Sequence, residues 1–241
     1  QLRRPIYVVC NDTLVENPII ANNAETRLGM ATADNNLFLR FFWEVNHRNT
    51  LLSCNSTEES ELADEQWYPY AKGGSFRKWY GNNEYLVNWK NNGYAIRNFS
   101  DEKGKIRSHN YNLDFIFKKG ITWNALSSGN TSFRVLDKSL FDNAGSSLFC
   151  KNEHYYNLLG YLNSKLIQKI VPIINPTFNY QPGTISSLPY LIKDVENIVR
   201  QNISISKLDW DAHETSWDFK CNPLLERMND CGQNVADLDM L

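Results

Sequence analysis

The chain has 241 residues, of which 42% are hydrophobic and 22% charged, and its formal net charge is −2. This composition fits an ordinary soluble protein that can bury a sizeable core. No run of about 18 apolar residues occurs, which excludes a transmembrane helix of the usual kind.

The first residues and the cysteines indicate the compartment in which the protein is expected to function. Residues 1–10 have a basic start but an apolar run of only four residues, so no signal peptide is expected. The chain begins with Gln1 and runs straight into strand-like sequence, which predicts a piece cut from a longer protein. Five irregularly spaced cysteines without a CxxC pair favour free thiols over disulfides or a zinc site. We therefore expect a cytoplasmic protein without a metal.

The first part of the chain alternates predicted strands with polar segments. β-branched and aromatic residues predict strands at 6–9 and 37–45. The polar stretch 22–36 predicts a loop between them. The acidic stretch 53–66 predicts either an exposed helix or a mobile loop.

The middle of the chain is predicted to be mostly β. Between residues 67 and 149, short apolar runs are broken by Gly, Asn and Ser, with turn signals at Gly73-Gly74 and Asn91-Asn92-Gly93. The candidate strands are 85–89, 94–97, 114–117, 121–123, 132–136 and 147–149.

The apolar period then changes from that of a strand to that of a helix. Leu158, Leu162, Leu166 and Ile170 recur every four residues. This spacing predicts an amphipathic helix of about five turns over 151–171.

A proline-rich connector and two further helices are predicted after this helix. Four prolines between residues 172 and 189 predict an extended segment, and the first of them is expected to end the helix. A second helix is predicted over 191–201. A third is predicted to start at Ser206, with Asp209 completing a capping box. The last dozen residues are polar and are expected to fray.

These elements together predict an α+β fold. We expect a loop-rich, mostly antiparallel β domain over residues 1–190, supported by the amphipathic helix. A small helical C-terminal tail is expected over 191–241.

The charge is distributed unevenly along the chain. Residues 67–134 hold eleven Lys or Arg against four Asp or Glu, a net charge of +7, whereas the remainder has a net charge of −9. A basic block of this kind predicts a face that binds a polyanion. The alternative is a set of solvated lysines on scattered loops.

The densest mixture of binding residues lies at 67–83. It combines three cations, five Trp or Tyr side chains and a Gly-Gly pair. Glycine lets the backbone approach a phosphate, Arg and Lys contact phosphate or guanine, and Asn can pair with adenine. The alternative is a hairpin with its aromatics in the core and its cations at the rim. The candidate DNA-binding residues here are Lys72, Gly73, Gly74, Arg77, Lys78, Tyr80, Asn82 and Asn83.

A second polar loop occupies residues 120–134. Ser127, Ser128 and Asn130 carry groups that can donate to phosphates, and we include them among the DNA-binding candidates. A plain hairpin turn is the alternative interpretation.

The motifs of catalysis are missing or incomplete. The sequence has no glycine-rich nucleotide loop, and its four histidines lack metal-ligand spacing. Asn175-Pro176-Thr177-Phe178 comes close to the Asn-Pro-Pro-aromatic tetrapeptide of amino-group DNA methyltransferases, but Thr replaces the second proline. We interpret it as a turn, and we assign no catalytic, cofactor-binding or metal-binding residue.

Several segments resemble one known family. The resemblance rests on KGGSFRKWYGNNEYLVNWKNNGYAIRNF, GITWNALSSGNTSFR, LLGYLNSK and NPTFNYQPGTISSLP. These resemble the C-terminal half of the large adenine-specific methyltransferases of BREX-type phage-defence systems (PglX-like). Those enzymes are relatives of type IIG restriction-modification enzymes. The resemblance covers about residues 28–220, most of the chain.

The resemblance implies that catalysis and target recognition belong to different parts of the parent enzyme. In such enzymes the catalytic domain, which uses S-adenosylmethionine, is N-terminal, and the C-terminal half recognises the DNA target. It implies that Gly29, Thr32, Asp34 and Asn35 mark the beginning of the recognition domain. It also implies that the basic middle of the chain faces double-stranded DNA and that the Leu158 helix supports it.

This chain alone is then expected to bind no cofactor and to transfer no methyl group. Its expected partners are double-stranded DNA, the N-terminal methyltransferase domain of the parent chain and defence-system proteins, with no membrane. A carbohydrate-binding module is an alternative that accounts for the aromatics but not for the +7 block. A protein-interaction module is another.

Overall fold

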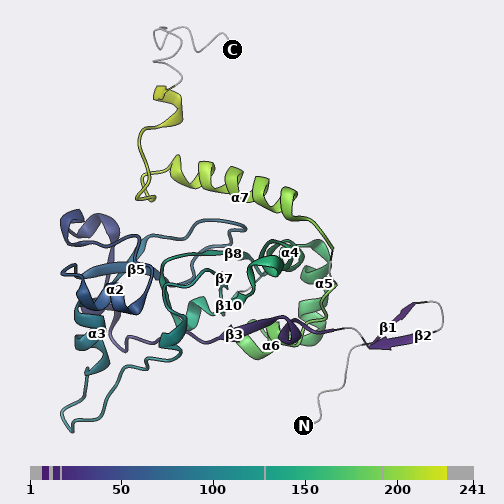
Figure 1. The fold of residues 1–241 in the computed structure, drawn as a ribbon, viewed down its shortest axis with the longest axis horizontal. Coiled ribbons are helices and arrows are strands. Elements are labelled where there is room, and N and C mark those ends of the chain that lie inside the picture. The colour runs from purple at the N-terminus through teal and green to yellow at the C-terminus, as the bar shows by residue number, and fades with distance from the viewer. Residues whose placement is uncertain (1–6, 11–12, 17, 128, 192, 227–241) are drawn as a thin grey trace.

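The chain folds around two four-stranded sheets that are built from strands far apart in the sequence (Figure 1). The computed structural model describes residues 7–10, 13–16, 18–127, 129–191 and 193–226. The first sheet has the order β3-β10-β7-β8 and is antiparallel throughout. Its strands are β3 (Ala24–Arg27), β7 (Gly120–Trp123), β8 (Phe133–Leu136) and β10 (Ser147–Cys150).

The second sheet has the order β4-β6-β5-β9. Its strands are β4 (Leu39–Phe41), β5 (Trp67–Ala71), β6 (Tyr85–Asn88) and β9 (Leu140–Phe141). All pairs are antiparallel except β5 and β9, which run parallel. Strands β1 (Tyr7–Cys10) and β2 (Thr13–Glu16) form a separate antiparallel hairpin. The predicted α+β, mostly antiparallel fold is therefore confirmed.

Helices cover the first sheet and enclose the first core. They are α4 (Asn152–Leu162), α5 (Lys165–Ile174), α6 (Pro182–Ser186) and α7 (Glu196–Asp211). Trp123 and Phe133 of the sheet share this core with Leu158 and Leu162 of α4. The Trp123 indole donates to the Tyr180 carbonyl at 2.8 Å, so its one polar group is satisfied within the core.

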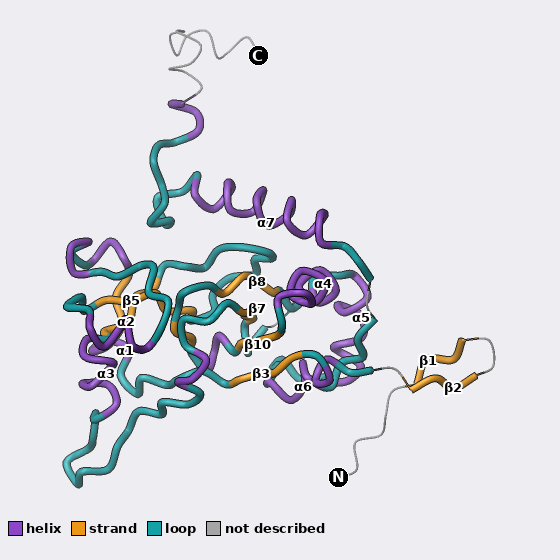
Figure 2. The backbone as a smooth tube through the Cα atoms, in the orientation of Figure 1, coloured by secondary structure: helices purple, strands orange, loops and turns teal. Residues whose placement is uncertain are grey.

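The second core lies beneath the other sheet. It contains Tyr68, Val87, Trp89 and Leu140, all fully or almost fully buried. The helices on this side are α1 (Asn35–Phe38), α2 (Thr57–Leu62) and α3 (Lys90–Arg97). Single 3-10 turns are η1 (Ile20–Asn22), η2 (Phe42–Glu44), η3 (His47–Asn49), η4 (Leu113–Phe115) and η5 (Asn143–Gly145). Loops join most of these elements (Figure 2).

The long helix predicted over 151–171 is two helices, and this prediction was wrong in two respects. The chain bends at Asn163, whose side chain donates to the Phe133 carbonyl at 2.9 Å and accepts from the Phe133 amide at 3.1 Å. Ser164 then caps α5 by accepting from the Ile167 amide. Pro172 does not end the helix as predicted but lies inside α5, which continues to Ile174. The tertiary contact of Asn163, which the period of apolar residues does not reveal, breaks the helix.

The C-terminal region also differs from prediction. The two helices predicted at 191–201 and from Ser206 form one continuous helix, α7, and Ser206 lies in its interior. No Gly or Pro interrupts 196–211, so the helix continues through the capping-box pattern at Ser206. The predicted extended connector 172–189 contains the end of α5 and the short α6. The predicted frayed end, the last dozen residues, lies outside the described residues.

Four of the six candidate strands in the middle of the chain are confirmed, as β6, β7, β8 and β10. The strands predicted at 94–97 and 114–117 were wrong, because these residues form the end of α3 and the turn η4. Asn91, Asn92 and Gly93 all have positive φ, between 52° and 71°, and turn the chain over the Trp89 ring. Three successive left-handed residues convert the segment from a strand into a turn.

Predictions for the first part of the chain were partly right. Strand β1 matches the prediction at 6–9 as far as residues are described, and the acidic stretch 53–66 contains helix α2. Only three residues of the predicted strand 37–45 are extended in β4. The predicted loop 22–36 was wrong in part, since it contains β3, which pairs with β10.

Helix α7 shares the first core with the rest of the domain. Val199 is buried there, and Val195 and Ile203 pack against it. The division of the chain after residue 190 stays a prediction. No helix in the described part of the chain is long and apolar enough to cross a membrane.

Candidate nucleic-acid interface

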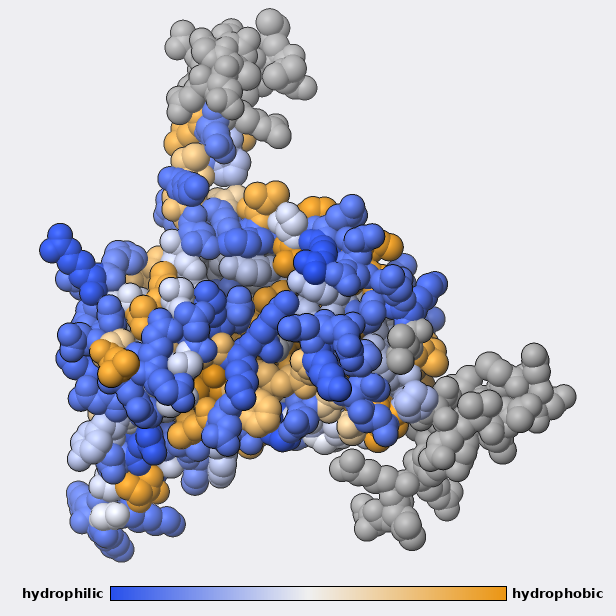
Figure 3. Space-filling view, viewed as in Figure 1, coloured by the Kyte–Doolittle hydropathy of each residue, from blue (hydrophilic) through white to orange (hydrophobic). Residues whose placement is uncertain are grey.

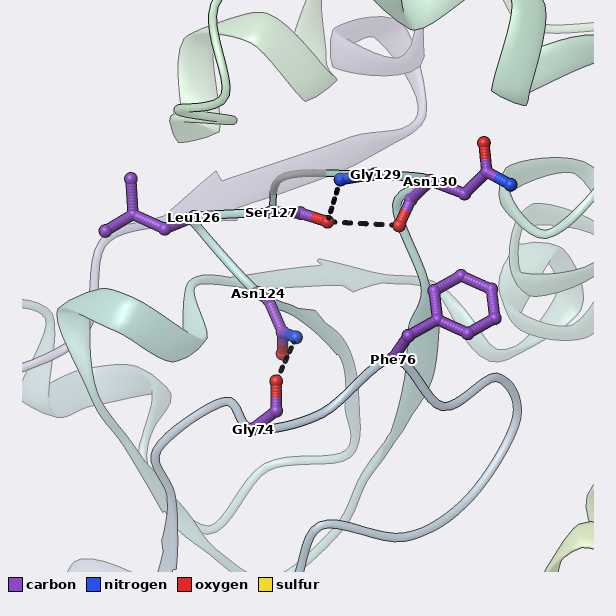
Figure 4. Close-up of a pocket in the computed structure, with 7 residues that line it drawn as sticks. All are labelled: Gly74, Phe76, Asn124, Leu126, Ser127, Gly129 and Asn130. Atoms are coloured by element: carbon purple, nitrogen blue, oxygen red, sulfur yellow. Dashed lines mark hydrogen bonds between the residues drawn. The ribbon is translucent and has the colours of Figure 1, made fainter.

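Two loops that the sequence indicated separately meet at one surface hollow (Figure 4). One connects β5 to β6, and the other connects β7 to β8. They are joined where the Trp79 amide donates to the Phe133 carbonyl and the Val135 amide donates to the Trp79 carbonyl, both at 2.9 Å. The hollow is open to solvent and has a volume of about 440 Å³. It is lined by Gly74, Phe76, Asn124, Leu126, Ser127, Gly129 and Asn130.

The Gly73-Gly74 pair forms the tight turn at one side of the hollow. Both residues have positive φ, 91° and 135°, a conformation that favours glycine. A side chain on Gly74 would collide with Asn82, whose amide donates to the Ser75 carbonyl at 2.8 Å. Asn82 is only 4% exposed, so its side chain holds the turn together from within. A contact of Asn82 with adenine stays a prediction.

Lys72 belongs to a polar cluster at the beginning of the same loop. Its Nζ lies 3.2 Å from Asp142 Oδ2 and donates to Asn35 Oδ1 at 3.3 Å. Tyr70 also donates to Asp142 Oδ2, at 2.7 Å. Burial and the adjacent Asp142 carboxylate raise the pKa of Tyr70 well above its ordinary value, so the phenol stays a donor. The cluster fixes Lys72 against Asn35 and Asp142, which are 37 and 70 positions away in the sequence.

Arg77 connects the loop to helix α7. Its guanidinium pairs with Asp209 and lies over the Trp210 ring, 5.0 Å from the ring centroid. Its Nε donates to the Tyr80 carbonyl at 3.0 Å, which closes the loop on itself. The side chain is half-buried between loop and helix, so in this structure Arg77 acts as a tether.

Lys78 and Tyr80 are also engaged within the chain. Lys78 Nζ donates to the Asn163 carbonyl at 2.8 Å, and burial lowers the pKa of its ammonium group. Lys207 of α7 lies 4.8 Å from the Tyr80 ring centroid and donates to the Tyr80 hydroxyl at 3.3 Å. Burial is the main cause that raises the pKa of Tyr80. Roles of both residues at DNA stay predictions.

Of the remaining candidates, Ser127 and Asn130 line the hollow. Asn83 is half-buried near the end of the first loop, and Asn130 is exposed on the second. The Ser127 hydroxyl donates to the Asn130 carbonyl at 3.1 Å and accepts from the Gly129 amide at 3.4 Å. Ser128 lies outside the described residues. Sequence reasoning missed Phe76 and Leu126, which are 56% and 69% exposed at this rim.

Arg134 is buried between the two loops and contacts both of them. Sequence analysis counted it within the basic block, yet it is 1% exposed. It donates to Asn124 Oδ1 at 2.7 Å, to the Arg77 carbonyl at 3.2 Å and to Ser132 Oγ at 3.3 Å. Asn124 in turn donates to the Gly74 carbonyl. The signal for this role is a cation in the middle of the apolar strand 133–136.

Burial of Arg134 has an electrostatic cost that its surroundings offset. Burial lowers the pKa of Arg134 to about 10, and the nearby Glu84 carboxylate opposes that shift. At neutral pH the guanidinium therefore stays charged and keeps all its donors. One buried cation thus positions both loops at the hollow.

The Asn175-Pro176-Thr177-Phe178 segment is a turn, as predicted. The Asn175 side chain accepts from the Thr177 amide at 3.0 Å and donates to the Asn179 carbonyl at 2.7 Å. This is the self-bonding geometry of an Asx turn. Among the described residues, no group of three or more His, Cys, Asp or Glu side chains is placed to hold a metal ion.

The tether between loop and helix gives a first prediction. Arg77→Gln removes both the Asp209 pair and the contact with Trp210, so amide exchange should accelerate in residues 74–81 and in the last turns of α7. Loss of global stability should stay below about 1–2 kcal/mol, because the pair is partly solvated. Hydrogen exchange followed by mass spectrometry measures both.

Arg200→Gln is the matched control. Arg200 lies on the same helix but pairs with Glu196 one turn away. Its loss should leave exchange in residues 74–81 unchanged. Equal exchange of that loop in wild type and Arg77→Gln would show that Arg77 does not tether it.

The structure thus defines an α+β domain that presents two loops at one surface hollow. No family model matches the chain. It is 40% identical over 222 residues to the adenine-specific methyltransferase PglX of Lacticaseibacillus casei (strain Zhang), a match that covers 89% of this chain. It is 36% identical over 205 residues to the adenine-specific methyltransferase BrxX of Escherichia coli O9:H4 (strain HS), covering 83% of this chain.

The match occupies only part of each relative. The chain spans 18% of the length of PglX and 16% of the length of BrxX. It is therefore a relative of one segment of the PglX-like adenine-specific methyltransferases, and the resemblance inferred from the motifs is confirmed.

Proposed function

We propose that this chain is the DNA target-recognition domain of an adenine-specific DNA methyltransferase of a phage-defence or restriction-modification system. The observation that carries the proposal is the 40% identity to such a methyltransferase over 89% of the chain, which is only 18% of the relative. An enzyme that modifies one adenine in a defined sequence needs a surface that reads the neighbouring base pairs as well as a catalytic pocket. A folded segment of this size can supply that surface.

The chemistry of the hollow supports this role. Gly74 carries no side chain, so a phosphate can approach the backbone of the first loop closely, and Asn130 has the donor and acceptor of an amide that can pair with adenine. The exposed Phe76 and Leu126 are apolar groups of the kind that contact a thymine methyl. Polar and apolar contacts at one rim are what base-edge reading requires.

The residues of the hollow do not fit S-adenosylmethionine. Its lining contains no carboxylate, the group that commonly holds the ribose hydroxyls of a nucleotide cofactor. We place the binding site of the methyl donor in the catalytic domain of the parent protein. That catalytic domain, double-stranded DNA and defence-system proteins are the partners that we propose for this domain. Because chromosomal DNA lies in the bacterial cytoplasm, a protein that recognises it would be cytoplasmic.

A domain exchange tests the proposal. The matching segment of the Lacticaseibacillus casei PglX is replaced by this chain, and the methylated motif of cells carrying the hybrid is read by long-read sequencing. The expected result is adenine methylation at a new motif, because the exchanged segment selects the bases. Re-joining the relative's own segment through the same junctions is the control. Methylation by the hybrid at the original motif would place recognition elsewhere in the protein.

A further inference from the structure

The cations of the basic block fall into two groups. Lys72, Arg77, Lys78 and Arg134 are engaged within the chain, as described above. A second group is exposed, and among the described residues none of its members has a carboxylate within 4.0 Å. This group includes Arg97, Lys103, Lys105 and Arg107. The exposed cations of the second group are therefore the ones that need give up no ion pair within the chain to contact an external anion.

Three of these four cations stand on a projecting hairpin, residues 98–108, here called the basic hairpin. It extends from the body between α3 and β7, at the lower left of Figure 1. The Asp101 amide donates to the Lys105 carbonyl at 2.9 Å, and the Arg107 amide donates to the Phe99 carbonyl at 2.8 Å. Gly104, at φ +76°, completes the turn. In the space-filling view this projection is mostly hydrophilic (Figure 3).

The basic hairpin is held firmly at its base. The Ala31 and His109 backbones exchange hydrogen bonds of 2.8 and 2.9 Å. Phe99 packs edge-on against the buried Phe38, with ring centroids 5.1 Å apart. The projection is thus an ordered extension of the second core, and presenting its cations needs little further ordering.

The side chains of the hairpin are arranged for an external anion. Lys105 and Arg107 flank Ile106, which forms an isolated antiparallel bridge with Ser100, so in extended backbone this spacing of two residues directs both side chains to the same side. Arg107 lies over the Phe99 ring at 5.3 Å, which orders its guanidinium. The Asp101 carboxylate accepts from the backbone amides of Lys103 and Lys105, both at 2.9 Å, so it shapes the turn instead of pairing with a lysine ammonium.

We propose that the basic hairpin contacts the phosphate backbone of duplex DNA through Lys103, Lys105 and Arg107. This inference rests on the proposed function and adds a contact region apart from the hollow at Gly74. Exposed cations without amide groups suit phosphates, which position a protein on DNA, whereas the hollow carries the groups that suit base edges. The hairpin would raise affinity for every sequence without changing the motif.

The test compares two variants that each lose three positive charges. One is Lys103→Gln/Lys105→Gln/Arg107→Gln on the hairpin. The other is Lys165→Gln/Lys169→Gln/Lys193→Gln, here called the α5 variant. Lys165 and Lys169 are exposed on α5, which lies on the opposite side of Figure 1 from the hairpin, and Lys193 is exposed in the segment before α7. Binding of the full chain to a fluorescein-labelled DNA duplex is followed by anisotropy across roughly 50–200 mM NaCl.

Each phosphate contact contributes about 0.9 to the slope of log affinity against log salt. The hairpin variant should therefore flatten the slope by about two to three units, and the α5 variant by less than about one. Circular dichroism with an unchanged melting temperature confirms that both variants fold.

Three outcomes would overturn the proposal. Equal slopes for the two variants would mean diffuse attraction by net charge, with the proposed function left standing. A hairpin variant that loses binding only to an RNA duplex would assign the hairpin to RNA. No salt-dependent DNA binding by the unmodified chain would overturn both this inference and the DNA-reading role of the isolated domain.

Discussion

Replacing Arg134 by leucine is expected to lower the free energy of unfolding by about 3 kcal/mol. The guanidinium is 1% exposed and donates to Asn124, to the Arg77 carbonyl and to Ser132. Leucine fills part of the volume but leaves these three acceptors without their donor inside the protein, and each loss costs about 1 kcal/mol or more. For a chain of this size the melting temperature should fall by roughly 6–12 °C.

The same change should also disturb the hollow. Without Arg134, Asn124 loses the contact that orients its amide toward the Gly74 carbonyl. The two loops should then lose their fixed spacing, and affinity for DNA should fall even at temperatures where the variant is folded. Arg134→Lys should be intermediate, because an ammonium is a compact point charge that cannot reproduce the planar fork.

Arg48→Leu is the control for the chemical change itself. Arg48 is exposed, so losing its charge and gaining an apolar side chain should alter stability by no more than about 0.5 kcal/mol. Chemical denaturation and a DNA-binding isotherm of all three variants give the comparison. An Arg134→Leu protein as stable as Arg48→Leu would show that Arg134 does not hold the loops.

The sequence predicted the parts of the fold that depend on local pattern. Strands β6, β7, β8 and β10 follow from short runs of apolar and β-branched residues between turn signals. The errors occur where a distant contact or an unusual backbone conformation dominates. The apolar period runs through Asn163 without a sign that its amide pairs with Phe133, 30 residues earlier. The three left-handed residues from Asn91 to Gly93 likewise redirect a segment with strand composition.

The candidate site was predicted at the level of loops and less well at the level of side chains. Both loops indicated by composition do meet, because β5–β6 and β7–β8 are connected through Trp79. Counting charges could not reveal which cations are already paired. Asp142 and Asp209, the partners of Lys72 and Arg77, lie 70 and 132 positions away in the sequence. Pairing at such separations is a property of the tertiary fold, and the exposed cations of the basic hairpin became distinct only in the structure.

Gly29 lies where the resemblance placed the beginning of the recognition domain, and Gly29→Ala is expected to be among the most destabilising single changes in the chain. A Cβ at this position would fall well inside 3.0 Å of the backbone atoms of Phe141 and Asp142. Those atoms cannot give way like the end of a flexible side chain. The Met30 amide donates to the Phe141 carbonyl and the Asn143 amide donates to the Met30 carbonyl, both at 2.9 Å.

Relief of the collision requires β9 and the residues after it to separate from residues 29–30. That movement displaces Asp142, whose carboxylate receives hydrogen bonds from Tyr70 and Lys72. We therefore expect a loss of about 3 kcal/mol or more in the free energy of unfolding, at the upper end of the cost of overpacking. Weaker DNA binding should accompany it, because Lys72 leads directly into the Gly73-Gly74 turn.

Gly129→Ala is the matched substitution. No atom lies within 4 Å of an added Cβ at Gly129, and its φ lies outside the left-handed range, so stability should change by less than about 0.5 kcal/mol. Urea denaturation of the two variants separates a local collision from a general effect of adding a methyl group. Equal midpoints for Gly29→Ala and Gly129→Ala would mean that residues 29–30 and 141–142 can move apart without cost. In that case the close backbone contact could not be what positions Asp142 and Lys72.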